Sequence, residues 1–281
     1  MIQLPIIGAF LEATGTLIEK KILKNKKISS STYTTFSFLA IVLVMLPFIW
    51  FFWSANSQAL KPGNLILFAL VIISAIIGNL LTYYSLKREK ISEFEPIWLM
   101  QPLFTIILAF FVYGSERRFE VLIFALIASI SLIAAHIKKH HINFDKYSVS
   151  LLVGCLFFAI ELVASKPILN FYSPFTFYFV RCVFISVIMF LMFRPKFKNL
   201  GGKKNNLLIL LVGVMWAVYR VILYYGYLSY GIIFTTTLFI LAPVFLLIIA
   251  AIFMKEKMTV RQIVSTIIIL VCVAGAIYFG N

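Results

Sequence analysis

The chain has 281 residues, of which 62% are hydrophobic and only 12% are charged, and its formal net charge is +15 at pH 7. Soluble domains contain about 45–50% apolar and about 25% charged residues, so this composition excludes an ordinary soluble domain and indicates a protein surrounded by lipid. The positive charge does not indicate nucleic-acid binding, because it is spread over short connections that contain no binding module.

Ten apolar segments follow one another along the chain, each about as long as an α-helix that crosses a ~30 Å hydrocarbon core. They are too long, and alternate too little, for the strands of a membrane barrel. The connections leave no room for a soluble domain, and no cleavable signal peptide is expected, because the basic residues follow the first apolar run. We predict an all-α integral membrane protein with ten transmembrane helices, near 4–19, 33–53, 65–84, 94–113, 119–136, 148–165, 174–193, 207–227, 232–254 and 260–279.

The basic residues predict how these helices are oriented, because Lys and Arg near helix ends are retained in the cytoplasm. If the helices alternate in direction, most of the 25 Lys and Arg residues lie in the connections on one side. We therefore expect a multi-pass protein of the cell (plasma or inner) membrane, with both termini outside and the basic connections in the cytoplasm against anionic lipid. The side that carries the termini has only four basic residues: Lys61, Arg117, Arg118 and Lys166.

The sequence repeats itself, which decides the predicted architecture. Residues 80–117 align with residues 221–257, and residues 8–23 align with residues 154–169. Many of the matches are common apolar residues, but a Tyr pair followed at equal distance by a proline within a helix is not. The alignment superposes Tyr83 on Tyr224, Tyr84 on Tyr225, Pro102 on Pro243 and, after a shift of one residue, Glu116 on Glu256.

Each half of the chain therefore contains five predicted helices, with the first repeat at 1–141 and the second at 142–281. An odd number of helices per repeat forces the two copies into opposite orientations in the membrane. Inverted repeats of this kind are the design of many secondary transporters.

The two predicted repeats resemble those of a known family. A proline in the fourth helix of each repeat, and a Glu just after it in "GSERR" (114–118) and "MKEKM" (254–258), resemble the ten-helix EamA-type branch of the drug/metabolite transporter superfamily. The segment "YSPFTFYFVR" (172–181) resembles the start of the second helix of such a repeat. The first repeat departs from this pattern, because "SSSTYTTFSF" (29–38) has neither Pro nor Arg, so Arg181 has no counterpart there.

The resemblance implies a transporter with a central cavity lined by helices 1–4 and 6–9, while helices 5 and 10 are peripheral. Members of the family carry amino acids, nucleotide sugars, phosphorylated sugars and other polar metabolites. The resemblance therefore implies a small polar metabolite as the substrate without naming it.

Polar side chains recur on single faces of the predicted helices, where residues three, four and seven apart coincide. Glu12 and Glu161 lie on stripes that the repeat alignment superposes to within about one turn. A charge at the bilayer centre costs roughly 2.5–3.5 kcal/mol or more, so these residues should face one another or water. We predict a substrate-binding site formed by the in-helix charges and the aromatic and amide side chains near them: Glu12, Asn79, Tyr83, Trp98, Gln101, Glu161, Arg181, Trp216, Arg220 and Tyr224.

Two interpretations of these charges remain open. They could form ion pairs, Glu161 with Arg181 or Glu12 with Arg220, that fix the helix register and bind nothing. The neighbouring Trp, Tyr, Asn and Gln residues favour a binding site, since an ion pair alone needs no aromatic and amide lining.

Other polar residues are assigned structural roles. Glu19 precedes Lys20 and Lys21 at the predicted membrane edge and is interpreted as a solvated charge outside the site. The histidines lie at a basic membrane boundary without a nearby carboxylate or cysteine, so no metal site is predicted. The three cysteines are interpreted as small packing residues within apolar helices: Cys155, Cys182 and Cys272.

We predict a secondary active transporter that works by alternating access. Burial favours the neutral form of a carboxylic acid, so Glu12 or Glu161 could carry a proton and couple transport to the proton gradient. Arginine can hold a carboxylate or phosphate with two hydrogen bonds, and a mixture of acid and base suits an amino acid, another zwitterion or an organic anion. Pro102 and Pro243 interrupt helical hydrogen bonding and are the predicted hinges.

Other function classes fit less well. A membrane enzyme acting on diphosphates commonly needs clustered Asp for Mg²⁺, whereas this chain has the single aspartate Asp145 and no "HExxH", "GxSxG" or P-loop motif. A channel or a membrane scaffold with structural ion pairs is the alternative, but the inverted repeat and the matching prolines favour a carrier. No cofactor is expected, and the sequence does not distinguish a monomer from a homodimer.

Overall fold

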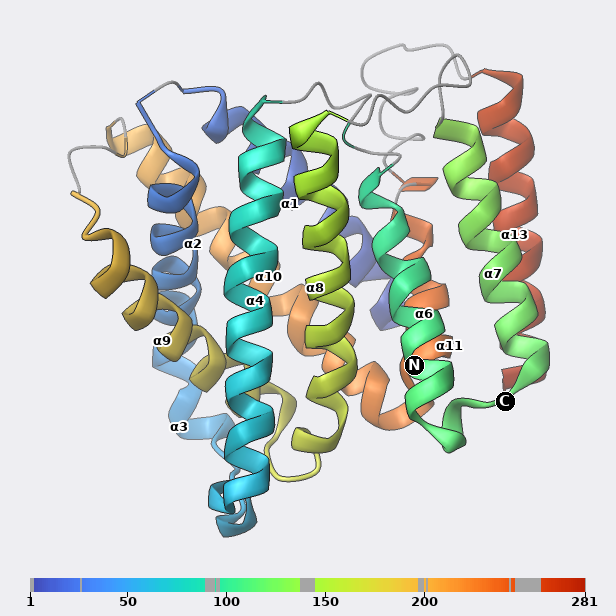
Figure 1. Ribbon diagram of the computed structural model, residues 1–281, viewed down its shortest axis with the longest axis horizontal. Helices are drawn as coiled ribbons and strands as arrows, with labels where there is room; N and C mark the ends of the chain where they lie inside the picture. Colours follow the sequence, from blue (N-terminus) through green and yellow to red (C-terminus); the bar gives the residue numbers. More distant parts are fainter. Residues whose placement is uncertain are drawn as a thin grey trace.

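The computed structural model describes residues 3–25, 27–88, 94, 97–136, 145–196, 200, 202–242, 244–245 and 259–280. The described part of the chain is a bundle of α-helices (Figure 1). The helices are α1 (Gln3–Leu23), α2 (Ser30–Met45), α3 (Ile49–Phe52), α4 (Pro62–Arg88), α6 (Met100–Val112), α7 (Phe119–His136), α8 (Lys146–Ile168), α9 (Pro174–Phe193), α10 (Lys203–Tyr230), α11 (Ile232–Phe239) and α13 (Val260–Gly280). Short 3₁₀ turns lie at Leu46–Phe48 (η1), Ser57–Leu60 (η2) and Gly114–Glu116 (η3).

These helices confirm the predicted all-α membrane fold. Within the described residues, six helices are long and apolar enough to cross a membrane, and α6 and α7 are shorter apolar helices. Four of the described helices, α1, α4, α8 and α10, extend a few residues beyond the predicted apolar runs, because polar residues at the boundaries continue the helical hydrogen bonding. The predicted ninth helix is described mainly as α11, and Pro243 and Glu256 lie outside the described residues.

Side-chain caps explain where several of these helices begin. Ser173 accepts a hydrogen bond from the Thr176 amide, and Pro174 occupies the first turn of α9, where its missing N–H costs nothing. Asp145 accepts bonds from the amides of Tyr147 and Ser148 at the start of α8. In a membrane these caps satisfy backbone groups that lipid cannot.

The two repeats pack against each other helix by helix. The pairs in contact are α1 with α10, α2 with α9, α4 with α8, α6 with α11, and α7 with α13. In Figure 1, α4 runs toward the upper end of the bundle, whereas its repeat equivalent α10 runs toward the lower end. The pairing and the opposite directions are those of two inverted five-helix repeats.

The fifth helix of each repeat lies away from the centre. Figure 1 shows α7 and α13 side by side at one edge of the bundle. Their contact includes Gly275, whose missing Cβ would lie 2.6 Å from the Phe124 ring. The remaining helices surround the central polar residues, as the family resemblance implied.

A close backbone approach joins α4 to α8. An added Cβ at Gly154 would lie 2.9 Å from Thr82 Oγ1 and 3.3 Å from the carbonyl oxygen of Gly78. Small residues let membrane helices approach closely and gain packing energy where the hydrophobic effect contributes little. This contact holds the third helix of one repeat against the first helix of the other.

Replacing Gly154 by leucine should destabilise the protein, because the larger side chain has no space between α8 and α4. Overpacking typically costs about 1–3 kcal/mol, so the melting temperature of the purified protein in detergent should fall. Gly63, where an added Cβ meets nothing within 4 Å, provides the control Gly63→Leu. Equal melting temperatures for the two variants would contradict the tight α4–α8 contact.

Candidate substrate-binding site

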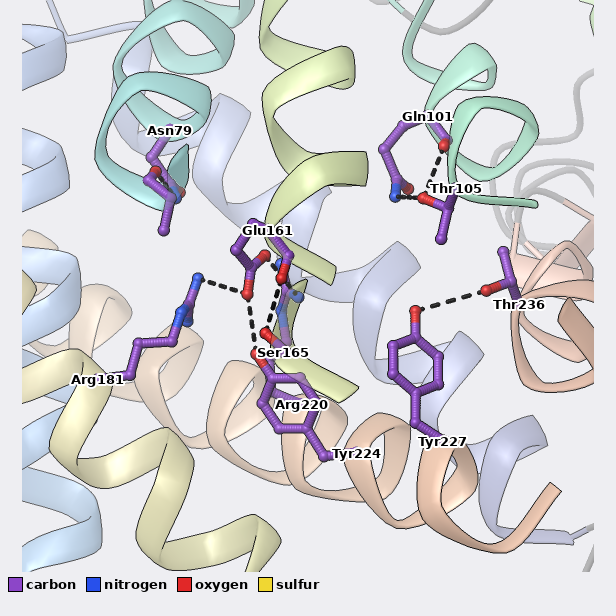
Figure 2. Close-up of polar contacts among 11 residues, drawn as sticks. Asn79, Gln101, Thr105, Glu161, Ser165, Arg181, Arg220, Tyr224, Tyr227 and Thr236 are labelled. Carbon is purple, nitrogen blue, oxygen red and sulfur yellow. Dashed lines mark hydrogen bonds and ion pairs between the residues drawn. The ribbon is translucent and has the colours of Figure 1, made fainter. Parts of the chain in front are cut away.

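A buried carboxylate, Glu161 of α8, lies between two arginines at the centre of the bundle (Figure 2). Arg181 of α9 approaches Glu161 Oε1 at 3.2 Å, and Arg220 of α10 approaches Oε2 at 3.3 Å. Tyr224, one turn beyond Arg220, donates a hydrogen bond of 2.9 Å to Oε1. We call these four residues the arginine–glutamate cluster.

Aromatic rings support both guanidinium groups. Arg181 lies 5.5 Å from the ring centre of Tyr178, and Arg220 lies 5.7 Å from that of Tyr219 and 6.0 Å from that of Trp216. Ring faces attract cations, most strongly where water is excluded. The spacing along each helix explains the arrangement. Arg181 follows Tyr178 by three residues on α9, and on α10 Arg220 follows Trp216 by four residues and Tyr219 by one.

The arginine–glutamate cluster confirms one of the two predicted ion pairs and corrects the other. Glu161 pairs with Arg181 as expected, but Arg220 also pairs with Glu161 and not with Glu12. Glu12 interacts with Arg220 only at longer range. One carboxylate cannot neutralise two guanidinium groups, so the cluster carries a net positive charge.

A second buried carboxylate, Glu19 of α1, corrects the prediction of a solvated charge at the membrane edge. Its exposed fraction is only 2%. Three neutral donors from other helices bind its Oε1: the Tyr83 hydroxyl at 2.7 Å, the Trp216 indole N–H at 2.8 Å and the Tyr33 hydroxyl at 3.1 Å. These donors stabilise the carboxylate in one orientation, and within the described residues no hydrogen bond reaches Oε2.

Two adjoining cavities lie beside these charges. The smaller, of about 40 Å³, is lined by Glu19, Arg181 and Arg220, together with neutral residues of which Asn79, Thr82, Tyr83, Phe158 and Trp216 are examples. The larger, of about 80 Å³, is lined by Glu12 and by residues of α6 and α11. The cavities share four wall residues: Thr16, Leu86, Phe94 and Trp98.

The larger cavity also brings together polar groups of α6, α10 and α11. Gln101 donates a hydrogen bond of 2.9 Å to the Thr105 hydroxyl, and the hydroxyls of Tyr227 and Thr236 lie 3.4 Å apart (Figure 2). Glu12 is partly exposed on this wall and interacts with Tyr219. A carboxylate here can contact water or a solute directly.

Most of the predicted site residues therefore gather around the two cavities. Glu12, Asn79, Trp98, Gln101 and the hinge residue Pro102 line one or the other. The exceptions are Glu161 and Tyr224, which are 0% exposed. Glu161 pairs with both arginines, and Tyr224 donates a hydrogen bond to Glu161. The other cavity-lining residues of the prediction are Tyr83, Arg181, Trp216 and Arg220.

Sequence reasoning missed Glu19 and its tyrosine partner Tyr33. Glu19 lies seven residues after Glu12 on the same helical stripe, so the spacing alone could have placed it in the site. The adjacent lysines had indicated a solvated position for Glu19. Lys20, however, is itself buried and donates a hydrogen bond to the carbonyl oxygen of Leu86. No pattern in the sequence indicated Tyr33, because its role depends on the packing of α2 against the other helices.

The three cysteines are buried and free, which confirms the packing role predicted for them. Cys155 of α8 lies near the carbonyl oxygen of Ile97, at 3.5 Å. Two of the three histidines, His140 and His141, lie outside the described residues.

Two inverted repeats around a central polar site form the architecture of a membrane transporter. The sequence profile of the EamA-like transporter family matches residues 1–135 and residues 146–278. The chain therefore belongs to the EamA-like transporter family, of the drug/metabolite transporter superfamily, as the resemblance had indicated. It is a multi-pass membrane protein of a family that transports small molecules.

The fold also has a counterpart among solved structures. A structure titled "Crystal structure of protein" matches 98% of this chain and 96% of its own chain with a TM-score of 0.70. The two sequences are 14% identical, so this likeness concerns the fold alone. The comparison with curated proteins finds no match.

Glu161→Gln should destabilise the protein more than Arg181→Met does. The first change leaves two buried cations facing each other, whereas the second leaves Glu161 paired with Arg220. Removing one partner of a buried ion pair typically costs about 3–5 kcal/mol, so thermal unfolding in detergent should separate the two variants. If Arg181→Met proved equally damaging, the second arginine would not compensate for the loss of the first.

Proposed function

We propose that this protein is a secondary active carrier that moves a small zwitterionic metabolite, such as an amino acid, across the cell membrane by alternating access. The observation that carries the proposal is the smaller cavity, whose wall contains a carboxylate and two arginines. A solute with one anionic and one cationic group can contact both kinds of charge. The carrier function itself involves no chemical change in the solute.

The arginines are suited to the anionic group of the solute. The arginine–glutamate cluster has an excess of positive charge, and both Arg181 and Arg220 line the cavity. Arg181 Nε is buried and has no hydrogen-bond partner among the residues that the structure describes, which leaves a donor available near the cavity. Guanidinium groups hold carboxylates with paired, charge-assisted hydrogen bonds.

Glu19 is suited to the cationic group. Its Oε1 is held by three neutral donors, and no hydrogen bond to its Oε2 is seen among the described residues. The Thr82 hydroxyl, which lines the same cavity, has no partner in the described part of the chain. An ammonium group has three donors, so it can bind the free carboxylate oxygen and this hydroxyl together.

Aromatic side chains separate and line the two cavities. Trp98 stacks beside Phe94 with ring centres 5.9 Å apart and meets Phe158 edge to face at 5.7 Å. Trp98 and Phe94 contribute to both cavities, so a change in their side-chain positions would join the two spaces. The proposed route of the solute therefore runs from the larger cavity past Trp98 to the charges.

Glu12 is proposed as the proton-coupling residue, because it lines the larger cavity and forms no ion pair with the described residues. Pro102 lines the same cavity near the start of α6 and is the proposed hinge, with Pro243 as its repeat counterpart. The charge distribution supports cytoplasmic basic connections and outside termini. A channel is the alternative class, and its conductance would far exceed the turnover of a carrier.

Thermal-shift measurements on the purified protein should identify the class of solute, because a ligand stabilises the folded state that binds it. Each amino acid is compared with its decarboxylated amine and with the acid that lacks the amino group. Only the zwitterion should raise the melting temperature. An equal shift with the acid alone would replace the zwitterion by an organic anion, and no shift with any of the three would reject the proposed solute class.

Glu19→Gln should weaken binding of the zwitterion by at least about tenfold, because a hydrogen bond to a charged group contributes roughly 1.5–3 kcal/mol. Glu120, an exposed acid at the start of α7, provides the control Glu120→Gln, which should bind normally. Binding isotherms measure the difference. Unchanged affinity in Glu19→Gln would exclude Glu19 from the site.

Proton coupling predicts a separate defect in Glu12→Gln. In proteoliposomes, an inward proton gradient should drive accumulation of the solute by the wild-type protein. Glu12→Gln cannot release a proton, so it should lose this response while still exchanging labelled for unlabelled solute. Gradient-driven accumulation that survives in Glu12→Gln would assign the coupling to another group.

A further inference from the structure

A third buried carboxylate, Glu116, lies outside the walls of the two cavities, in the turn η3 between α6 and α7. Although it belongs to a surface connection, its exposed fraction is only 7%. Its Oε1 accepts a hydrogen bond from the Ile232 amide at 2.8 Å, and its Oε2 accepts one from the Ile233 amide at 3.2 Å. Glu116 also forms an ion pair with Lys166 near the end of α8.

These contacts join the two repeats. Glu116 belongs to the first repeat, whereas Lys166 and the start of α11 belong to the second. The amides at the start of a helix carry partial positive charge and have no partner within the helix. A carboxylate that binds two of them and a lysine therefore holds the end of α6 against α8 and α11 with charge-assisted hydrogen bonds.

The backbone of α11 is shaped to accept this carboxylate. Gly231 has a φ of +88°, and an added Cβ would lie 2.7 Å from Glu116 Oε1. Any other residue at this position would be strained and would collide with the carboxylate. A neighbouring contact joins the same elements, because the Tyr113 hydroxyl donates a hydrogen bond of 2.7 Å to the carbonyl oxygen of Val163.

The contacts lie at one end of the larger cavity, about one turn of helix beyond its wall: Leu162 and Thr236 line the cavity, whereas Glu116 binds Lys166 and the amides of Ile232 and Ile233. The cavity wall continues to the end of α4 and the start of α6, and Figure 1 shows these helix ends toward the upper end of the bundle. Glu116 follows the far end of α6, at the lower end. Because α6 and α11 both line the larger cavity, they must separate at this lower end before a solute can leave there.

We propose that Glu116 is a gating residue. Its bonds to α11 and Lys166 close the transport pathway at the end of the bundle that carries the C-terminus, and they break when the carrier opens at that end. This rests on the alternating access of the proposed function. Opening lets water reach the carboxylate, the lysine and the α11 amides together, so none of them stays buried without a partner. The gate can therefore open without the free-energy cost of breaking an ion pair whose charges stay out of contact with water.

Cysteine accessibility tests the gate without any transported solute. Thr236 lines the larger cavity from α11, so Thr236→Cys reports whether a small membrane-impermeant thiol reagent reaches the cavity. The background carries alanine at the native cysteines, and vesicles of both orientations allow labelling from either face. With Glu116 present, labelling should be fast from the face with the basic connections and slow from the opposite face.

Glu116→Gln should speed labelling from the opposite face by about tenfold, because a neutral amide keeps only part of the charge-assisted bonding. Gly231→Ala should act in the same direction through steric conflict and backbone strain, without changing any charge. Glu120→Gln, an exposed carboxylate on the same side, is the control and should label like the parent. Melting temperatures confirm that each variant is folded.

Two outcomes would overturn the gate: equal labelling from both faces in the parent protein, or unchanged labelling in folded Glu116→Gln and Gly231→Ala. Because no solute is present, these outcomes are separate from a failure of the zwitterion proposal. A carrier of another solute class would still show the effect of Glu116.

Discussion

The structure depends on one constraint, that charged side chains in a membrane must find partners inside the protein. Glu161 meets this constraint by pairing with Arg181 and Arg220, which ties α8, α9 and α10 together around one carboxylate. The pairing is unequal, with two cations for one anion, so it stabilises the bundle and still leaves positive charge beside the smaller cavity. Structural ion pairing and solute binding are therefore properties of the same cluster.

The two repeats contribute different net charges to the centre. Glu12 and Glu19 both come from α1 of the first repeat, whereas the second repeat contributes the arginine–glutamate cluster with its excess of positive charge. A motion of one repeat against the other changes the distance between the acids of α1 and this cluster. A zwitterion bound between them would connect the repeats, so its arrival and departure can bias such a motion.

The sequence was sufficient to predict the helices, the inverted repeats and a set of site residues most of which line the cavities, because helix length, charge distribution and duplication are local or periodic signals. It was not sufficient to predict which buried charged side chains pair with each other. The sequence suggested Glu12 as the partner of Arg220, whereas the structure pairs Arg220 with Glu161, because spacing along one helix does not show which side chain of another helix lies opposite. Glu19 was misassigned for a related reason: its adjacent lysines are visible in the sequence, whereas its three donors come from α2, α4 and α10.

The glycine contact between α4 and α8 has a mechanical consequence. Gly78 and Gly154 bring the two backbones together: the carbonyl oxygen of each lies 3.3–3.4 Å from the position that a Cβ would take on the other, and the Phe158 ring packs against Gly78. Because backbone approach, more than interlocking side chains, sets this contact, one helix can tilt on the other here while the contact itself is kept. Glu161 and Lys166, the partner of Glu116, both follow Gly154 along α8, so such a tilt moves the charged centre and the Glu116 contact in the same direction, and the Glu116 contact by more.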